Sequence, residues 1–342
     1  MFKQLVLATA FAIPALAARA WAADAALIAA AKAEGKLNWY TTQIVDQAAR
    51  PLGEAFEKTY GIKVDYTRTD AAETTRRLLA ESEAGKAEAD VFDGAAGPSH
   101  ALTDKKLVMS YTPEAAQRLP SQYADKAGLW VATNLYVYTL GVNTDLVPRG
   151  TEPKYFSDLL EPKWKAKMAW SGRASTSSAP GFIGAVLDEM GPDKAMDYLR
   201  ALAKQNIAPV AVSARQLLDQ TIAGEYSIAI EIISNHATIS KAKGAPCDFA
   251  PLDRSLVVFS VLSAMRDAPH PNAAKLFLDF VMSPAGQAIY RDRDYIPIDP
   301  AVPPREKRLR PDTGGFIGFE LPPEEVEESL PKWFAIYKQV FG

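Results

Sequence analysis

Short apolar segments alternate with segments of helical spacing along most of the chain. In the first part, residues 36–40, 62–66 and 89–92 have the β-branched and aromatic composition of strands. Residues 47–59 and 70–85 between them have helical periodicity, and Asp70 followed by Glu73 is a capping box that would open the second helix. The order strand, helix, strand, helix, strand predicts a parallel sheet with ligand contacts at the carboxyl ends of its strands.

A second α/β block follows, and a long extended segment flanks it on each side. Residues 130–142 and 256–265 are these two segments, and strands at 167–170, 209–212 and 226–233 lie between them. Two extended crossings would join two lobes by a hinge, with a cleft that can open and close. The pattern therefore predicts an α/β protein of two lobes.

The positions of the crossings set the expected domain boundaries. We assign residues 23–130 together with 258–295 to lobe 1, and residues 131–257 to lobe 2. Residues 296–342 form a C-terminal segment that packs on the lobes. Within it, the Pro-rich stretch and the basic cluster 305–310 have the composition of a solvated surface tail.

The first 22 residues have the pattern of a secretory signal. An uncharged apolar run at 5–18 follows a basic start, and Ala20-Trp21-Ala22 supplies the small residues of a cleavage site. An uncleaved membrane anchor is the alternative, but the run is shorter than the ~20 residues of a spanning helix. Cleavage removes Lys3 and Arg19 and no acidic residue, which changes the formal charge from -3 to -5. We expect the mature protein in the periplasm.

Composition narrows the classes of partner. The 342 residues are 48% hydrophobic and carry 38 basic against 41 acidic side chains, a balance that argues against nucleic acid as a partner. A single cysteine, Cys247, excludes an internal disulfide framework, and we expect it to be buried. Three separated histidines offer little for a zinc site. We expect neither a metal centre nor a cofactor.

Several motifs together resemble one family. They are WYTT at 39–42, ADVF at 89–92, SDLLEPKW at 157–164, AGE at 223–225 and APHPNAAKLF at 268–277. The chain resembles the periplasmic solute-binding proteins of ABC transporters, in the subgroup named for ferric iron binding. The resemblance implies a type II two-lobe fold, a monomer without enzymatic activity, and a small molecule held between the lobes. It also implies delivery of that ligand to an inner-membrane ABC permease and its ATPase.

The iron ligands of the ferric members are absent from the matching positions. Those members use a His after the first strand, a Glu after the third strand, and two adjacent Tyr after the strand that follows the Gly–Glu pair. Here the positions hold Gln43, Ala95, and Ser234 with Asn235. Hard ferric iron prefers anionic oxygen donors. We therefore expect no binding of bare Fe³⁺, and a ferric or ferric-complex binding protein is the alternative function.

Candidate ligand contacts lie at strand ends and near helix starts, where hydroxyl, amide and guanidinium groups suit a small anion such as a carboxylate or a phosphate-bearing solute. Ordinary helix caps and surface charges are the alternative interpretation. The candidates are Thr41, Thr42, Arg68, Thr69, Gly97, Ser171, Arg173, Thr176, Ser177, Ser178, Glu231, Asn235 and His236.

Glu231 stands inside an apolar strand and needs a partner, because an unpaired buried carboxylate is costly. An internal Arg or Lys is the favoured partner, and a ligand hydroxyl, amine or protein-bound cation is the alternative. Asn235 and His236 follow at the strand end, and His236 is otherwise the start of a helix.

A secreted α/β hydrolase is the rival class. The chain lacks the Gly-x-Ser-x-Gly, His-Glu-x-x-His and Gly-x-x-x-x-Gly-Lys-Ser/Thr motifs. A hydrolase would require His100, His236 or His270 to meet a serine in space. We expect no catalytic residue.

Overall fold

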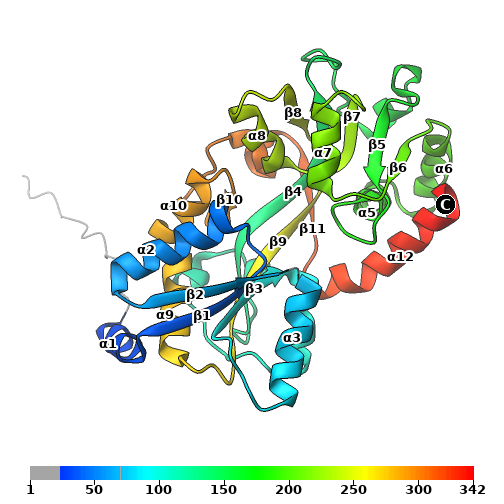
Figure 1. Ribbon diagram of the computed structural model, residues 1–342. Coiled ribbons are helices and arrows are strands. Elements are labelled where there is room, and N and C mark those ends of the chain that lie inside the picture. Colours follow the sequence, from blue (N-terminus) through cyan, green and yellow to red (C-terminus); the bar gives the residue numbers. More distant parts are fainter. Residues whose placement is uncertain (1–23, 70) are drawn as a thin grey trace, which may run out of the picture.

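The computed structural model describes residues 24–69 and 71–342 (Figure 1). The strands are β1 (Lys36–Thr41), β2 (Lys63–Arg68), β3 (Val91–Ala95), β4 (Val131–Asn143), β5 (Met168–Ser171), β6 (Ala208–Val210), β7 (Ile228–Ile233), β8 (Cys247–Ala250), β9 (Arg254–Ala264), β10 (Ile296–Pro297) and β11 (Ile317–Glu320). The α-helices are α1 (Ala25–Glu34), α2 (Arg50–Tyr60), α3 (Ala71–Glu83), α4 (Ala96–Asp104), α5 (Ala179–Met190), α6 (Pro192–Ala203), α7 (Ala214–Ile222), α8 (Ser234–Ala242), α9 (Pro271–Met282), α10 (Pro284–Asp292), α11 (Pro311–Gly314) and α12 (Pro323–Phe341).

One continuous sheet has the strand order β2-β1-β3-β9-β4-β7-β5-β6, with β8 and β10 also pairing with β4, and β11 with β9. Strand β1 is parallel to β2 and β3, which confirms the predicted order of the first block. Strand β5 is likewise parallel to β6 and β7 in the second block. Each half of the sheet therefore brings the carboxyl ends of several strands together, and the candidate contacts were expected at such ends.

Strands β4 and β9 run through both halves of the sheet (Figure 1). Strand β4 pairs with β9 through residues 131–137 and with β7 through residues 138–142. Strand β9 pairs with β3 through residues 260–264 and with β11 at its beginning. The two extended crossings predicted from the sequence are confirmed. The lobe boundaries at 130/131 and 257/258 stay predictions.

Local signals account for several ends of the elements. Ser213 and Gln216 form the predicted capping box of α7. Gly61, at φ 73°, ends α2 in the left-handed conformation that glycine tolerates. Pro180 occupies the first turn of α5, as its fixed φ favours. The predicted cap residue Asp70 lies outside the described residues.

The Pro-rich and basic stretch 296–310 is not a solvated tail, and that prediction is wrong, because Ile298 and Leu309 within it are buried. Strands β10 and β11 join the sheet, and α12 packs along α5 (Figure 1). Trp333, Tyr337 and Phe341 follow one another at four-residue spacing on α12, and the last two contact the ring of Trp170 at 6.0 and 4.6 Å. This apolar stripe of α12 is buried against residues of lobe 2. The basic cluster that precedes α12 made the stripe hard to recognise in the sequence.

Candidate functional site

A row of polar side chains follows β4 from one half of the sheet to the other. Asn134, Tyr136 and Tyr138 occupy alternate positions of the strand and so share a face. The Gln43 amide donates to Asn134 Oδ1 at 3.2 Å, and the Tyr136 hydroxyl donates to Gln43 Oε1 at 3.3 Å. The Tyr138 hydroxyl lies 3.2 Å from Thr176 Oγ1 in the second half. Strand β4 therefore connects the strand ends of both halves.

The ends of β1 and β3 form the first part of this site. Thr41 Oγ1 accepts the Gln43 backbone N–H at 3.0 Å, and the Gln43 amide also donates to Ser260 Oγ at 3.2 Å. The backbone N–H of Thr42 donates to the Asp93 carbonyl, and that of Thr69 to the Thr41 carbonyl. Buried Thr41 thus supports its neighbours, while Thr42 is partly exposed.

Asp93 is a buried carboxyl at the end of β3. Trp39 Nε1 donates to its Oδ1 at 2.8 Å, whereas Oδ2 has no hydrogen-bond partner among the described residues. Burial raises the pKa of Asp93 from 3.8 to about 7, and the polar groups of Thr41, Gln43 and Trp39 oppose this shift only in part. Near neutral pH the carboxyl is therefore about half protonated.

The loop 171–178 carries hydroxyl groups with different roles. Ser171 is buried and donates to the Val212 carbonyl at 2.7 Å, which fixes the start of the loop. Ser175 and Ser177 hydroxyls lie 3.0 Å apart. Ser178 is the N-cap residue of α5, yet its side chain makes no capping hydrogen bond. Of this loop, Thr176 is joined directly to the β4 row.

Glu231 is 4% exposed and has φ 66°, a left-handed conformation within β7. The pairing of β4 with β7 shifts register at this place, between Thr139 and Gly141. No hydrogen bond reaches Oε1 from a described residue, and burial raises the pKa of Glu231 well above its ordinary value. The favoured expectation of an internal Arg or Lys partner is wrong for the described structure, because no such charge acts on the carboxyl.

The first turn of α8 adds further buried polar atoms directly after β7. It begins with Ser234, Asn235 and His236, whose Oγ, Oδ1 and Nδ1 atoms have no hydrogen-bond partner among the described residues. Burial and the charge of Arg215 lower the pKa of His236 to about 4. The imidazole is therefore neutral at pH 7, and its position at a helix start agrees with the alternative reading of the sequence.

Two arginines among the candidates are exposed. Arg68 ends β2 and Arg173 follows β5, and the guanidinium group of neither makes a hydrogen bond or ion pair with a described residue. The charge of Arg68 nevertheless acts on Tyr295, whose ring lies 6.3 Å from that of Tyr136. Gly97 lies in the first turn of α4, and its contacts are outside the described part of the structure.

Residues 52–309 match a family described as bacterial extracellular solute-binding protein. The chain belongs to this family. Over 154 residues it is 26% identical to the Fe(3+)-binding periplasmic protein of Serratia marcescens, a match that covers 44% of this solute-binding protein and 43% of the relative's length.

Solved structures of similar fold cover most of the chain. AfuA of Actinobacillus pleuropneumoniae, with exogenous fructose-6-phosphate bound, is 20% identical at a TM-score of 0.72, over 90% of this chain and 98% of that one. Iron-bound HitA of Pseudomonas aeruginosa is 20% identical at a TM-score of 0.70, and the match covers 89% of this chain and 99% of HitA. A substrate-binding protein of an Agrobacterium tumefaciens ABC transporter is 16% identical at a TM-score of 0.74, and the match covers 90% of this chain and 94% of that protein. These likenesses confirm the type II periplasmic binding protein fold.

Sequence reasoning missed Asp93, Asn134, Tyr136 and Tyr138 of this solute-binding protein as site residues. Asp93 directly follows the predicted strand 89–92, a position that could have marked it. Nothing in the sequence shows which face of β4 is turned to the strand ends. Trp39, Tyr40 and Trp170 are core residues, as expected of aromatics. We name Gln43, Asp93, Asn134, Tyr136, Tyr138, Thr176, Glu231, Ser234 and Asn235 the strand-end cluster.

Within residues 24–69 and 71–342, no three His, Cys, Asp or Glu side chains lie together as metal ligands would. No helix in these ranges combines the length and apolar character of a membrane span. Cys247 is buried, as expected.

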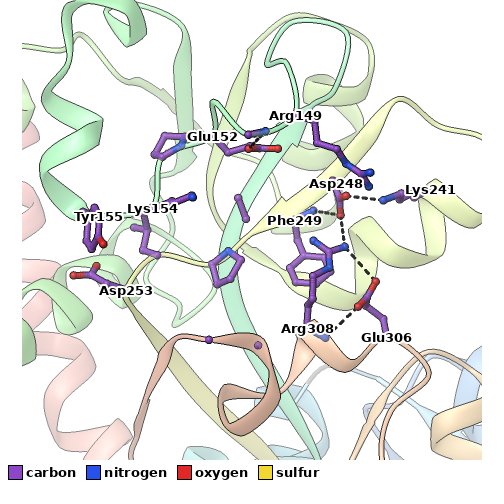
Figure 2. Close-up of a pocket in the computed structure, with 17 residues that line it drawn as sticks. Arg149, Glu152, Lys154, Tyr155, Lys241, Asp248, Phe249, Asp253, Glu306 and Arg308 are labelled. Carbon is purple, nitrogen blue, oxygen red and sulfur yellow. Dashed lines mark hydrogen bonds and ion pairs between the residues drawn. The ribbon is translucent and has the colours of Figure 1, made fainter.

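A second charged region lies elsewhere in the solute-binding protein (Figure 2). A cavity of about 670 Å³ is lined by the loop 149–155, β8, the residues before β9 and the C-terminal segment, and by no member of the strand-end cluster. Its Asp248 pairs with Lys241 at 2.6 Å and Arg308 at 3.1 Å, and Arg308 also pairs with Glu306 at 3.2 Å. We call this cavity the charged pocket.

Proposed function

We propose that this protein is the periplasmic solute-binding component of an ABC importer. In this role it captures a small anionic organic solute, a carboxylate or a phosphate- or phosphonate-bearing compound, between its lobes and delivers it to the permease with its ATPase. The family, the signal-like first 22 residues and the two crossing strands support this function. The mature protein acts as a monomer in the periplasm.

One observation carries the preference for an anion: Arg68 and Arg173 have no carboxylate partner among the described residues. Several other arginines are paired, such as Arg254 with Asp188 at 2.6 Å, whereas exposed Arg149 and Arg293 make no ion pair with a described residue. A guanidinium offers a planar fork of donors that matches carboxylate and phosphate oxygens. Arg68 ends a strand of the first half of the sheet, and Arg173 follows a strand of the second half. Closure of the lobes would bring both charges to one ligand.

The relatives leave two ligand classes to compare. HitA is titled as iron-bound, and AfuA as bound to fructose-6-phosphate. The positions that match the ferric ligands hold the neutral side chains of Gln43, Ser234 and Asn235, which supply no charge to hard Fe³⁺. Gln43 is moreover already bonded to Asn134 and Ser260. An organic anion therefore fits these residues better than bare iron.

A thermal-shift screen tests the ligand class. The panel contains carboxylates, phosphate esters, phosphonates, polyamines, ferric chloride and ferric citrate. Anionic organic compounds should raise the Tm, because a ligand that binds only the native state stabilises it. A shift with polyamines or ferric chloride alone would refute the proposal. Turnover of an ester such as p-nitrophenyl acetate would instead favour the hydrolase.

Variants then test the two arginines on whichever panel anion shifts the Tm most. R68A and R173A should each weaken its binding about tenfold or more in calorimetry, equivalent to about 1.4 kcal/mol. R293A is the matched control, because Arg293 is also exposed and makes no ion pair within the described residues. Equal affinity of all three variants and the wild type would remove both arginines from the site.

A further inference from the structure

Glu231 has an acceptor that the protein itself does not satisfy. The residue is 4% exposed, and Oε1 is enclosed without a hydrogen-bond partner among the described residues. Buried carboxyl groups in native proteins nearly always have a donor or a cation beside them, so an exception needs an explanation. Asp93 Oδ2 and Asn235 Oδ1 in the same strand-end cluster are further acceptors in this state.

Among the described residues, no cationic group near Glu231 could replace that partner. Tyr138 approaches from β4, Thr176 from the loop before α5, and Gly181 from the first turn of α5. A Cβ on Gly181 would lie 3.0 Å from Glu231 Oε1 and 1.8 Å from the Thr176 carbonyl oxygen. The Thr176 carbonyl oxygen and Glu231 Oε1, both acceptors, thus lie beside Gly181, where α5 has no side chain. None of these three neighbours is a cation.

The backbone adds an independent observation. Glu231 has a backbone φ of 66°, and residues other than glycine rarely adopt this conformation. It occurs where the register of β4 and β7 shifts, and such irregularities redirect a side chain from its regular face and are common beside binding sites. An apolar residue in regular strand geometry would avoid both the strain and the unpaired carboxyl.

We propose that Glu231 binds a hydrogen-bond donor of the solute, an ammonium or hydroxyl group. The solute is then an anion that carries such a donor a few bonds from its charge. This inference rests on the proposed function, because it concerns the same ligand. The arginines hold the anionic end, and Glu231 distinguishes the solute from simple anions of the same length.

The two donors differ in what happens to the proton of Glu231. Burial raises the pKa of Glu231 well above its ordinary value, which favours the protonated carboxyl in the free protein. An ammonium group would form an ion pair and release that proton to the buffer, whereas a hydroxyl group would bind without net release. Calorimetry of the wild type in bis-Tris and in Tris, two buffers without an anion that could compete for the site, therefore separates the two. The apparent enthalpy depends on the ionisation enthalpy of the buffer only when a proton is released.

Two matched series serve as probes. One contains propionate, 3-hydroxypropionate and β-alanine, and the other propyl phosphate, 3-hydroxypropyl phosphate and 3-aminopropyl phosphate. In at least one series a donor-bearing member should bind the wild type tenfold or more tightly than the simple anion. E231Q keeps the shape of the side chain and should reduce that preference to within twofold. E225Q, at an exposed glutamate, is the matched control and should retain it.

Each outcome decides a different question. Binding of all members of a series with equal affinity overturns the role of Glu231 and leaves the proposed function standing. Absence of binding by every member of both series overturns the inference and the anionic class together. A preference that survives in E231Q shows that another group recognises the donor, and it also overturns the inference. The buffer experiment on the wild type applies even if E231Q does not fold.

Discussion

Asp248 of the charged pocket and the two carboxyl groups of the strand-end cluster, Asp93 and Glu231, are in opposite states. In the charged pocket, Lys241 and Arg308 hold Asp248, and the pairs lower the pKa of that carboxyl despite its burial. In the strand-end cluster, no cation of the described structure pairs with Asp93 or Glu231, and burial raises the pKa of both. The presence of cationic partners, rather than the extent of burial, therefore determines whether the pKa of each carboxyl is lowered or raised.

The volume of the charged pocket does not by itself make it the better candidate for the ligand site. The charged pocket has a volume of about 670 Å³, within the range of ligand sites. Its Asp248 and Glu306 are nevertheless bonded within the protein, although Asp253 Oδ1 has no hydrogen-bond partner among the described residues. The Arg308 guanidinium also lies 4.5 Å from the centre of the Phe249 ring. Satisfied charges of this kind hold β8 to the C-terminal segment. Unsatisfied buried groups are the better indication of a missing ligand.

The largest expected effect concerns pH and Asp93. Between its ordinary pKa of 3.8 and its folded pKa of about 7, the folded state binds a proton that the unfolded state has lost. The free energy of unfolding should therefore fall by about 1.4 kcal/mol per pH unit as pH rises through this window. D93N should remove that fall in urea denaturation from pH 4 to 7. An unchanged slope would show that Asp93 is ionised in the fold.

Gly181→Ala should have the next largest effect. The new Cβ would lie 1.8 Å from the Thr176 carbonyl oxygen, so the loop 171–178 or α5 must move. We expect a loss of about 3 kcal/mol in the free energy of unfolding. Gly53→Ala is the control, since its Cβ would meet Val64 at 3.5 Å in ordinary contact and α2 would gain about 1 kcal/mol. Equal stability of both variants would contradict the close approach of Gly181 to the Thr176 carbonyl oxygen.

Asp248→Asn should have the smallest effect, and it should act on stability alone. Lys241 and Arg308 are 41% and 43% exposed, so solvent screens the pairs and the loss should be about 1 kcal/mol. Because the folded pKa of Asp248 is lowered, its contribution is present above pH 4 and disappears as pH falls through the folded pKa. Solute affinity in calorimetry should stay unchanged. A loss of affinity would give the charged pocket a part in binding.

The sequence predicted much of the fold because local patterns determined it. The helices after Ser213 and around Pro180 begin where capping and proline rules place them. The two crossing strands were recognisable as long apolar runs. The C-terminal helix α12 was missed because a basic, Pro-rich stretch precedes it. The role of its aromatic stripe is recognisable only from the packing against Trp170 in the structure.

The candidate site was predictable in outline and not in its contacts. Positions after strands indicated Thr42, Arg68 and the loop 171–178, because parallel strands end at one edge of a sheet. Whether their side chains contact a ligand stays a prediction. The sequence also marked Glu231 as a carboxyl in need of a partner, yet it favoured an internal cation that the described structure does not supply.

By itself, the sequence determined the periodicity of the elements, the parallel order of the first strands and the expected ligand edge, since these depend on neighbours in the chain. Only the tertiary structure decided which face of β4 carries Asn134, Tyr136 and Tyr138 to the strand ends. It also decided that Asp248 has cations beside it, whereas no described cation lies beside Glu231. Hydrogen bonds and ion pairs between distant segments depend on positions to within an ångström, and periodicity does not specify distances of that kind.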